Sequence, residues 1–299
     1  MRKIKEFFRY DNIGLLFILP AFIYMAYFVG YPIISNIVLS LKDVSVRNLA
    51  NGQQNFIGFA NYAEILSDEV FRKALVNTLV FTVSCLVFQF IIGFLLALLF
   101  NKRFKIAKPV RGLLMIPWMM PMTVTALMFK FMFSTDVGII NYMLRSIGII
   151  HENIEWLTTP GTAMAAVVMA NIWIGIPFNT ILLSTGLTTI PQELYESASV
   201  DGANKFQKLV NITIPLLKPT IESILVLGFI YTFKVYDLVY VMTEGGPVNS
   251  THLLSTYSYK LSFDMFQYSK GSAVANVLFV ILLLVGMLYI RITMKGEEE

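Results

Sequence analysis

Five stretches of the chain contain no Asp, Glu, Lys or Arg, and they constrain the fold more than any other feature. They cover 12–41, 74–101, 112–129, 156–192 and 271–290. A bilayer core about 30 Å thick is crossed by roughly 20 apolar residues of helix and tolerates ionised side chains poorly. Each stretch is therefore predicted to be one helical membrane span.

A sixth apolar stretch follows Pro219 and is interrupted by Glu222, Lys234 and Asp237, although its middle is wholly apolar. We count it as a span as well. The predicted fold class is all-α, a polytopic membrane protein with six transmembrane helices. The domain runs over 13–291, with spans at about 13–40, 75–100, 110–133, 161–186, 219–242 and 271–291.

Composition supports this prediction and excludes other classes. Apolar residues make up 56% of the chain and charged residues 14%, against about 25% charged in soluble domains. A soluble enzyme is nearly excluded, since one soluble core cannot hide so much apolar surface. One cysteine, Cys85, allows no intrachain disulfide and no zinc cluster.

The basic residues occur in short clusters between apolar runs, which is typical of membrane orientation and unlike a nucleic-acid-binding face. Placing the N-terminus in the cytoplasm puts roughly twice as many Lys and Arg inside as outside. The first span is too long for a cleaved signal and is predicted to be retained. Residues 1–12 and 292–299 are then cytoplasmic tails of an inner-membrane protein.

No motif for catalysis or nucleotide binding is found. The sequence lacks the Gly-x-x-x-x-Gly-Lys-Ser/Thr loop that cradles phosphates and the His-Glu-x-x-His pattern that binds zinc. The two histidines, His151 and His252, fall in predicted outer loops, where solvated side chains are the default. We therefore expect no catalytic residue, no metal and no cofactor on this chain.

The predicted inner loop at 188–218 carries a helix-start pattern. Thr189 with Gln192 three residues later, and Pro191 at a first-turn position, are typical of a helix N-terminus. The helix is expected to end at Asp201-Gly202, where glycine takes positive φ and aspartate caps the next element. A second short helix is expected before the fifth span.

The segment from Glu196 to Ala203, followed by Ile214-Pro215 and Pro219, resembles the EAA loop in permease subunits of binding-protein-dependent ABC importers. Ser197 stands where that motif usually has Ala. The resemblance implies a type I importer fold and a coupling helix that docks on an ATPase subunit. It assigns this role to Glu196, Ser197, Ala198, Asp201, Gly202 and Ala203.

Other segments resemble the sugar-permease branch of the same family, which includes MalF-type and glycerol-3-phosphate permeases. They are 56–62, 77–78, 236–247 and 271–275, together with Arg291. The resemblance implies import of a sugar or oligosaccharide by alternating access. Its implied partners are a second permease subunit, two ATPase subunits that bind ATP and Mg, and an extracytoplasmic solute-binding protein.

Two alternatives stay open. Within the family, the solute is glycerol-3-phosphate or another small polar compound. Outside it, the chain is an ion-coupled secondary transporter, a class that usually keeps ionisable groups at mid-membrane. Here Lys130 is expected near a span end, and Lys234 is expected to pair with Asp237 on one helix face.

Neutral polar and aromatic groups within the fourth and fifth spans are the candidates for a solute path. In the fourth span, helical spacing places an amide, a space and a ring on one face, at Asn171, Gly175 and Phe178. In the fifth, Gly228, Thr232 and Val235 make a similar face beside Tyr231, and Gln89 lies in the middle of the second. The alternative is that Asn171 and Gln89 only bond neighbouring helices and the small residues only allow close packing. The predicted path residues are Asn171, Gly175, Phe178, Gly228, Tyr231 and Thr232.

Overall fold

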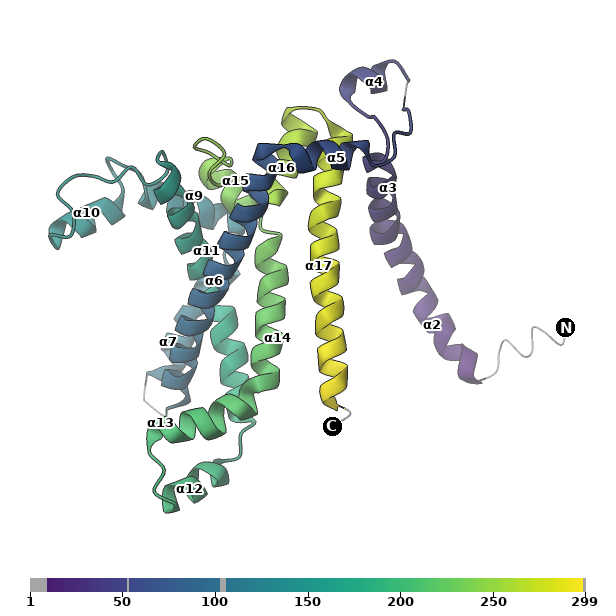
Figure 1. The fold of residues 1–299 in the computed structure, drawn as a ribbon. Helices are drawn as coiled ribbons and strands as arrows, with labels where there is room; N and C mark the ends of the chain where they lie inside the picture. The colour runs from purple at the N-terminus through teal and green to yellow at the C-terminus, as the bar shows by residue number, and fades with distance from the viewer. Residues whose placement is uncertain (1–9, 53, 103–105, 298–299) are drawn as a thin grey trace. The chain divides into compact units, whose positions relative to one another are not determined.

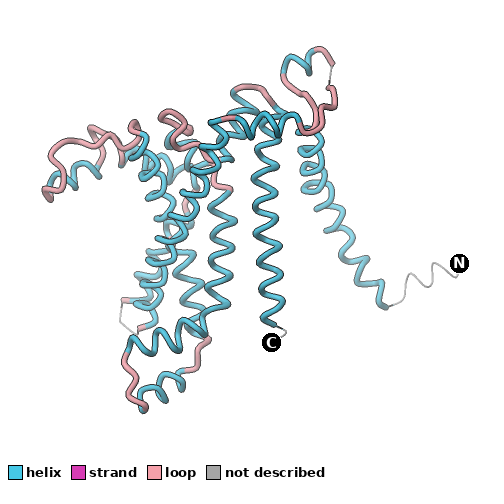
Figure 2. Tube along the Cα trace, viewed as in Figure 1, coloured by secondary structure: helices cyan, strands magenta, loops and turns pink. Residues whose placement is uncertain are grey.

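The computed structural model describes residues 10–52, 54–102 and 106–297. Helices make up nearly all of its regular structure, and the described part contains no named strand (Figure 2). One isolated bridge pairs Lys42 with Phe56. The prediction of an all-α chain is confirmed. Residues 1–9, which carry the basic cluster of the predicted cytoplasmic N-terminus, lie outside the described residues, as do 298–299.

Contacts divide the chain into two units. One comprises Met1–Leu66 with Ser258–Asn276, and the other Ser67–Tyr257 with Val277–Glu299. The helices and π-turns, labelled in Figure 1 where space allows, are α2 (Tyr10–Met25), η1 (Ala26–Gly30), α3 (Tyr31–Ser40), α4 (Val46–Ala50), α5 (Ala60–Ser67), α6 (Glu69–Asn101), α7 (Ala107–Leu114), α8 (Ile116–Met119), α9 (Met122–Met132), α10 (Ile139–Ser146), α11 (Pro160–Thr188), α12 (Gln192–Val200), α13 (Lys205–Lys208), η2 (Leu209–Thr213), α14 (Ile214–Phe233), α15 (Asp237–Thr243), α16 (Leu254–Tyr259), η3 (Lys260–Asp264) and α17 (Tyr268–Glu297).

The first unit is held together by a polar network around Asn276 of α17. Its amide donates to the Ser40 hydroxyl of α3 and the Tyr62 hydroxyl of α5, each at 3.0 Å. The Asn36 amide donates to the Asn276 side-chain oxygen at 2.7 Å. Inside a membrane protein such interhelical hydrogen bonds satisfy polar groups that would otherwise be desolvated.

The second unit is built around the pair α6 and α11, which share the most extensive contact between two helices. Small buried residues allow the close approach. A Cβ atom added at Gly93 of α6 would lie 2.6 Å from the Cβ atom of Asn179 on α11, and Ala166 and Ala170 of α11 are fully buried. Helix α14 packs against both α6 and α11.

Within the described residues, five helical stretches are long and apolar enough to cross a membrane, and the number is six if one bent helix pair is counted as a single span. The five are Phe17–Ser40, Glu69–Asn101, Pro160–Thr188, Lys205–Phe233 and Tyr268–Arg291. The prediction of a polytopic membrane protein is therefore confirmed. A stretch of helix was expected at each of the charge-free windows, and each window except 112–129 is centred on one of the five.

The third predicted span, 110–133, is not one helix. Pro109–Met119 and Met122–Met132 meet at an angle of 97°. Pro121 at the corner has no N–H to continue the hydrogen-bond ladder and takes an extended conformation with ψ 135°. The sequence shows Pro117 and Pro121 inside the window, so the signal for a break was present.

The fifth predicted span, 219–242, also differs from the structure. Helix α14 ends at Phe233, and α15 begins separately at Asp237. Between them the carbonyl oxygen of Val235 accepts the Ser255 hydroxyl at 2.5 Å, outside any helical ladder. At its other end α14 joins η2 and α13 without a break, so the run Lys205–Phe233 is continuously helical. The predicted loop 188–218 therefore already contains the start of this span.

Candidate functional site

A cavity of about 440 Å³ lies within the second unit, and we call it the α11 cavity. All six residues predicted for the solute path line it. The sequence predicted one helix face in each of two spans, and the structure shows that both faces line the same cavity. The lining comprises Gln89, Trp118, Met122, Asn171, Ile174, Gly175, Phe178, Gly228, Tyr231, Thr232, Lys234, Val235, Tyr236 and Asp237.

The α11 side of the cavity is organised by Gln89 of α6. Its side-chain Nε2 donates to the backbone oxygen of Asn171 at 2.9 Å, and both side chains are 4% exposed. A Cβ atom added at Gly175 would overlap the Gln89 amide. Gln89 therefore does bond a neighbouring helix, and it also lines the cavity.

Aromatic rings form much of the remaining wall. The ring of Phe178 on α11 lies between those of Tyr231 on α14, with centroids 6.0 Å apart and planes near perpendicular, and Trp118 on α8, at 6.4 Å. Gly228 is tightly packed, since a Cβ atom there would lie 2.7 Å from Leu86. The wall therefore combines flat apolar faces with a few amide and hydroxyl groups, as small-molecule sites do.

Trp118 and Met122 were not predicted as cavity residues. They flank the 97° corner of the broken span, at the end of α8 and the start of α9. The corner turns both residues toward α11, whereas a straight helix over 110–133 gives no reason to single them out. In the sequence, this arrangement was indicated only by Pro117, Trp118 and Pro121 within the charge-free window 112–129.

Two charged side chains line the cavity, Lys234 and Asp237, and their predicted pairing is wrong. Lys234 is the C-cap of α14 and Asp237 opens α15, so the two do not share a helix face. The Lys234 ammonium instead lies 5.3 Å from the centroid of the Tyr231 ring, a cation–π distance. Salt bridges within the described residues include Lys218–Glu222 and Lys270–Glu64.

The second candidate region is the segment 188–218. Helix α12 begins at Gln192, and Pro191 is its N-cap. The predicted capping by Thr189 is wrong, because its hydroxyl donates to the Gly186 oxygen in the last turn of α11 at 2.8 Å. The Gln192 amide is likewise engaged with Glu196 at 3.0 Å.

Gly202 has φ +79°, so the predicted positive φ is correct. The predicted capping role of Asp201 is wrong. Asn204 caps α13 instead, by a reciprocal capping box with Gln207 in which the two hydrogen bonds measure 2.9 and 2.8 Å. An Asn at this position competes well with Asp as an N-cap.

The predicted coupling residues lie on the surface of this segment. Glu196, Ser197, Asp201 and Gly202 are exposed, while Ala198 and Ala203 are half-buried. Two large apolar side chains accompany them: Val200 is 89% exposed and Phe206 72%. The segment therefore exposes apolar side chains beside its charged residues.

A third region is the loop between α15 and α16. His252 is 2% exposed, so the expectation of a solvated side chain is wrong for it. The Asn77 amide of α6 binds the backbone oxygens of Asn249, Ser250 and His252 at 3.5, 2.9 and 3.1 Å. Burial follows from these long-range bonds, which loop position alone does not reveal. His151 is exposed, as expected.

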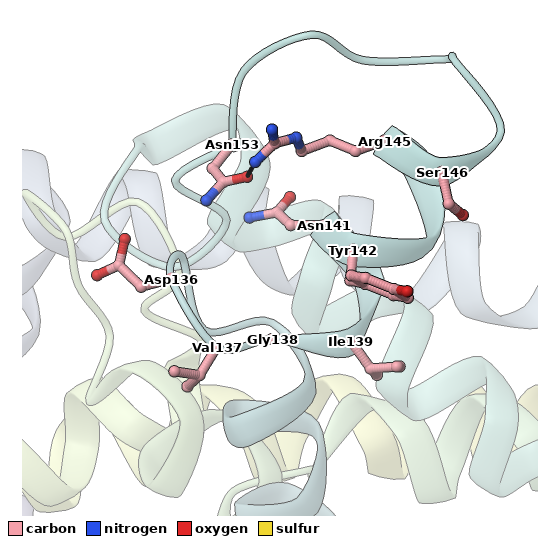
Figure 3. A pocket seen from close by; sticks show the side chains of 9 residues that line it. All are labelled: Asp136, Val137, Gly138, Ile139, Asn141, Tyr142, Arg145, Ser146 and Asn153. Atoms are coloured by element: carbon pink, nitrogen blue, oxygen red, sulfur yellow. Dashed lines mark hydrogen bonds between the residues drawn. The ribbon is translucent and has the colours of Figure 1, made fainter.

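A further cavity of about 570 Å³ lies around α10, and none of the predicted site residues line it. Figure 3 shows Arg145 reaching toward Asn153, with 3.4 Å between Nη1 and Oδ1, and Asp136 at the other side of the hollow. Asn141 holds this region together by accepting the Trp156 indole N–H at 2.9 Å. Within the described residues no group of three His, Cys, Asp or Glu side chains is placed to hold a metal ion.

Comparison with known proteins adds an independent observation. Residues 89–292 match a family described as "Binding-protein-dependent transport system inner membrane component". The trehalose/maltose transport system permease protein MalF of Thermococcus litoralis is 33% identical over 286 residues, which are 95% of this chain and 95% of that protein. The lactose transport system permease protein LacF of Rhizobium radiobacter is 35% identical over 282 residues, 93% of this chain and 92% of that one.

Two solved structures are also similar over nearly the whole chain. One is a bacterial ABC transporter involved in the import of the acidic polysaccharide alginate, with a TM-score of 0.80 and 28% identity, covering 98% of this chain and 100% of that one. The other is a bacterial alginate ABC transporter in complex with an alginate pentasaccharide-bound periplasmic protein, with a TM-score of 0.81 and 26% identity. It covers 97% of this chain and 96% of its counterpart.

Proposed function

Because this chain belongs to the family of binding-protein-dependent transport system inner membrane components, in which it is a permease subunit of a sugar ABC importer, we propose that sugar crosses the membrane through the α11 cavity. One observation carries the proposal. Residues of α11 and α14 line the same cavity, and its walls are aromatic rings with amides between them.

The chemistry of the walls supports a sugar as the solute. A sugar ring has apolar C–H faces that lie against aromatic side chains and hydroxyl groups that bond amides. Phe178, Tyr231 and Trp118 supply the faces, and Gln89 and Asn171 supply the amides. The named relatives carry trehalose or maltose and lactose, so the proposed cargo is a sugar or oligosaccharide.

The energy for transport comes from a partner. ATP and Mg are bound by a separate ATPase subunit, and α12 with residues 201–203 docks on it. Closure of two such ATPase subunits drives alternating access. The exposed coupling residues and the bare side chains of Val200 and Phe206 support this docking.

The remaining assembly follows from the family and from charge. A second permease subunit completes the transmembrane path, and an extracytoplasmic binding protein delivers the solute. The basic residues around 102–111 and 205–218 are proposed to lie inside, which places both termini in the cytoplasm of an inner-membrane protein.

Substitution of Gly202 tests the docking. Valine at a φ of +79° is strained, whereas asparagine tolerates this conformation. In proteoliposomes holding the whole complex, Gly202→Val is expected to lower sugar import per ATP hydrolysed, and Gly202→Asn to keep it. Gly286→Val on α17, where a Cβ atom meets nothing within 4 Å, is the control for membrane insertion. If all three variants import the same amount of sugar per ATP hydrolysed, the docking role of this segment is overturned.

A solute panel tests the cargo. Import of maltose, lactose and longer saccharides by the complex with its binding protein is expected to exceed import of glycerol-3-phosphate. Uptake driven by an ion gradient without ATP would contradict the proposal and favour a secondary transporter.

A further inference from the structure

One hydrogen bond joins the docking helix to the helix that lines the cavity. The Tyr195 hydroxyl of α12 lies 2.9 Å from the Thr213 hydroxyl, the last residue of the π-turn η2. Thr213 is 4% exposed. Its hydroxyl is also 3.3 Å from the Lys208 oxygen one turn back, so it lies between α12 and the start of the helical run.

Tyr195 differs from its neighbours on α12. It packs against a buried apolar cluster contributed by α6, α11, α14 and Ile190, which lies between α11 and α12. Glu196 and Ser197, the next two residues, are exposed. One face of α12 thus contacts the membrane part of the chain while the other is left for the ATPase. The cluster consists of Ala97, Leu183, Leu187, Ile190, Leu217 and Ile224.

Further hydrogen bonds join α12 to α13 across the turn at Gly202. The Lys208 ammonium donates to the Ser199 hydroxyl at 2.5 Å, and that hydroxyl donates to the Tyr195 backbone oxygen at 2.7 Å. The Ala203 N–H donates to the Ala198 oxygen at 2.8 Å. These bonds close the turn at Gly202, two of them through the exposed Ser199.

The path from Thr213 to the cavity is a single helix. The run Lys205–Phe233 is unbroken, and Gly228, Tyr231 and Thr232 near its far end line the cavity. Thr213 and Gly228 are separated by roughly 22 Å of helix at 1.5 Å per residue. The helix is continuous along this path, although Pro219 lies inside it, so it offers a direct structural connection from Thr213 to Gly228. The short π-helix η2 is an irregularity of a kind that is frequent at functional sites.

We propose that Tyr195 and Thr213 are positioning residues that transmit the movement of α12 along α14 to the cavity. This inference rests on the proposed function, since it requires that α12 docks on the ATPase. It goes further by naming the contact that links the docked helix to the solute path. Tyr195 and Thr213 lie away from the face of α12 that is proposed to contact the ATPase.

The test removes one hydroxyl at a time. Tyr195→Phe keeps the ring in the apolar cluster, and Thr213→Val keeps the shape of the side chain. The readout is sugar imported per ATP hydrolysed, by the complete complex with its binding protein in proteoliposomes. Each variant is expected to lower this ratio about fivefold, the equilibrium effect of one neutral hydrogen bond, with the ATPase rate little changed.

The chain supplies a matched control. The Tyr289 hydroxyl of α17 lies 2.8 Å from the Ser223 hydroxyl of α14, so Tyr289→Phe removes the same kind of bond from the same helix without touching α12. It is expected to leave the ratio unchanged. Thr213→Ser, which keeps the hydroxyl, is expected to behave like the native chain, and Tyr195→Phe with Thr213→Val like either single variant.

The outcomes separate the two claims. A native ratio in Tyr195→Phe and Thr213→Val, with a lowered ratio in Gly202→Val, would overturn the role of this bond and leave the docking intact. A native ratio in all three would overturn the docking itself. An equal loss in Tyr289→Phe would show that any hydrogen bond to α14 matters, which also contradicts the inference.

Discussion

The side-chain amide of Gln89 occupies the space that a side chain at position 175 would fill. Gln89 lies on α6 and Gly175 on α11, and a Cβ atom added to the glycine would overlap the amide carbon, nitrogen and oxygen. The amide also donates to the Asn171 oxygen one turn earlier on α11. One glycine therefore permits both the close approach of two spans and the amide at the cavity wall.

Gly175→Ala is expected to displace Gln89, break its bond to Asn171 and reshape the cavity. Overpacking of this kind costs about 1–3 kcal/mol of stability. Thermal denaturation of the purified complex and sugar import should both show the loss. Gly161→Ala, on the same helix at a position with open space around it, is the control and should leave both unchanged. Native stability and import in Gly175→Ala would contradict this packing.

The ring of Tyr231 is expected to be a contact surface for the sugar. It is 57% exposed, lines the cavity and lies beside Phe178. Tyr231→Ala should lower the apparent affinity for sugar import about tenfold, from the loss of one aromatic face, while Tyr231→Phe should lower it little. Tyr142→Ala, which removes an exposed tyrosine that lines the cavity around α10 and not the α11 cavity, is the matched control. Equal import kinetics in the two alanine variants would contradict a role in the solute path.

Asn77 is expected to hold the loop between α15 and α16 in place. Its amide meets three backbone oxygens of that loop. Asn77→Ala leaves them without this donor, at a cost of about 1–3 kcal/mol. Hydrogen exchange of the amides in 245–254 should become faster. The exposed Asn101 at the other end of α6 supplies the control Asn101→Ala, and unchanged exchange in Asn77→Ala would argue against the anchoring role.

Orientation is testable because the native cysteine is buried. Cys85 has no exposed surface, so it should not react with a maleimide that cannot cross the membrane. His151→Cys should be labelled in intact cells, and Asn101→Cys only after permeabilisation, since both positions are exposed in the structure. The reverse pattern would place the termini and α12 outside and would exclude the proposed ATPase docking.

Several features were predictable from the sequence because they depend on residues close together in the chain. The charge-free windows predicted where helices would lie, since a bilayer tolerates ionised side chains poorly. The spacing of Asn171, Gly175 and Phe178 predicted a shared helix face, and all three line the cavity. The Asp-Gly pair predicted the positive φ at Gly202, where a Cβ atom is strained.

Other features depended on which of several possible partners a side chain contacts, and the sequence pattern does not show this. Thr189 fits the capping pattern, but its hydroxyl bonds the end of α11 instead. Lys234 and Asp237 have helical spacing, but α14 ends at Phe233, just before Lys234, and a separate helix begins at Asp237. Each local rule holds only while no other partner offers a better contact.

The sequence by itself determined that the chain lies in a membrane, where its helices form and which residues share a helix face. Apolar composition and helical period are properties of single segments. Only the tertiary structure decided which faces meet. Gln89 against Gly175, Asn77 against the loop at His252, and Tyr195 against Thr213 are contacts between separate elements. Such contacts are selected by how several helices pack at once, so no pattern within one segment predicts them.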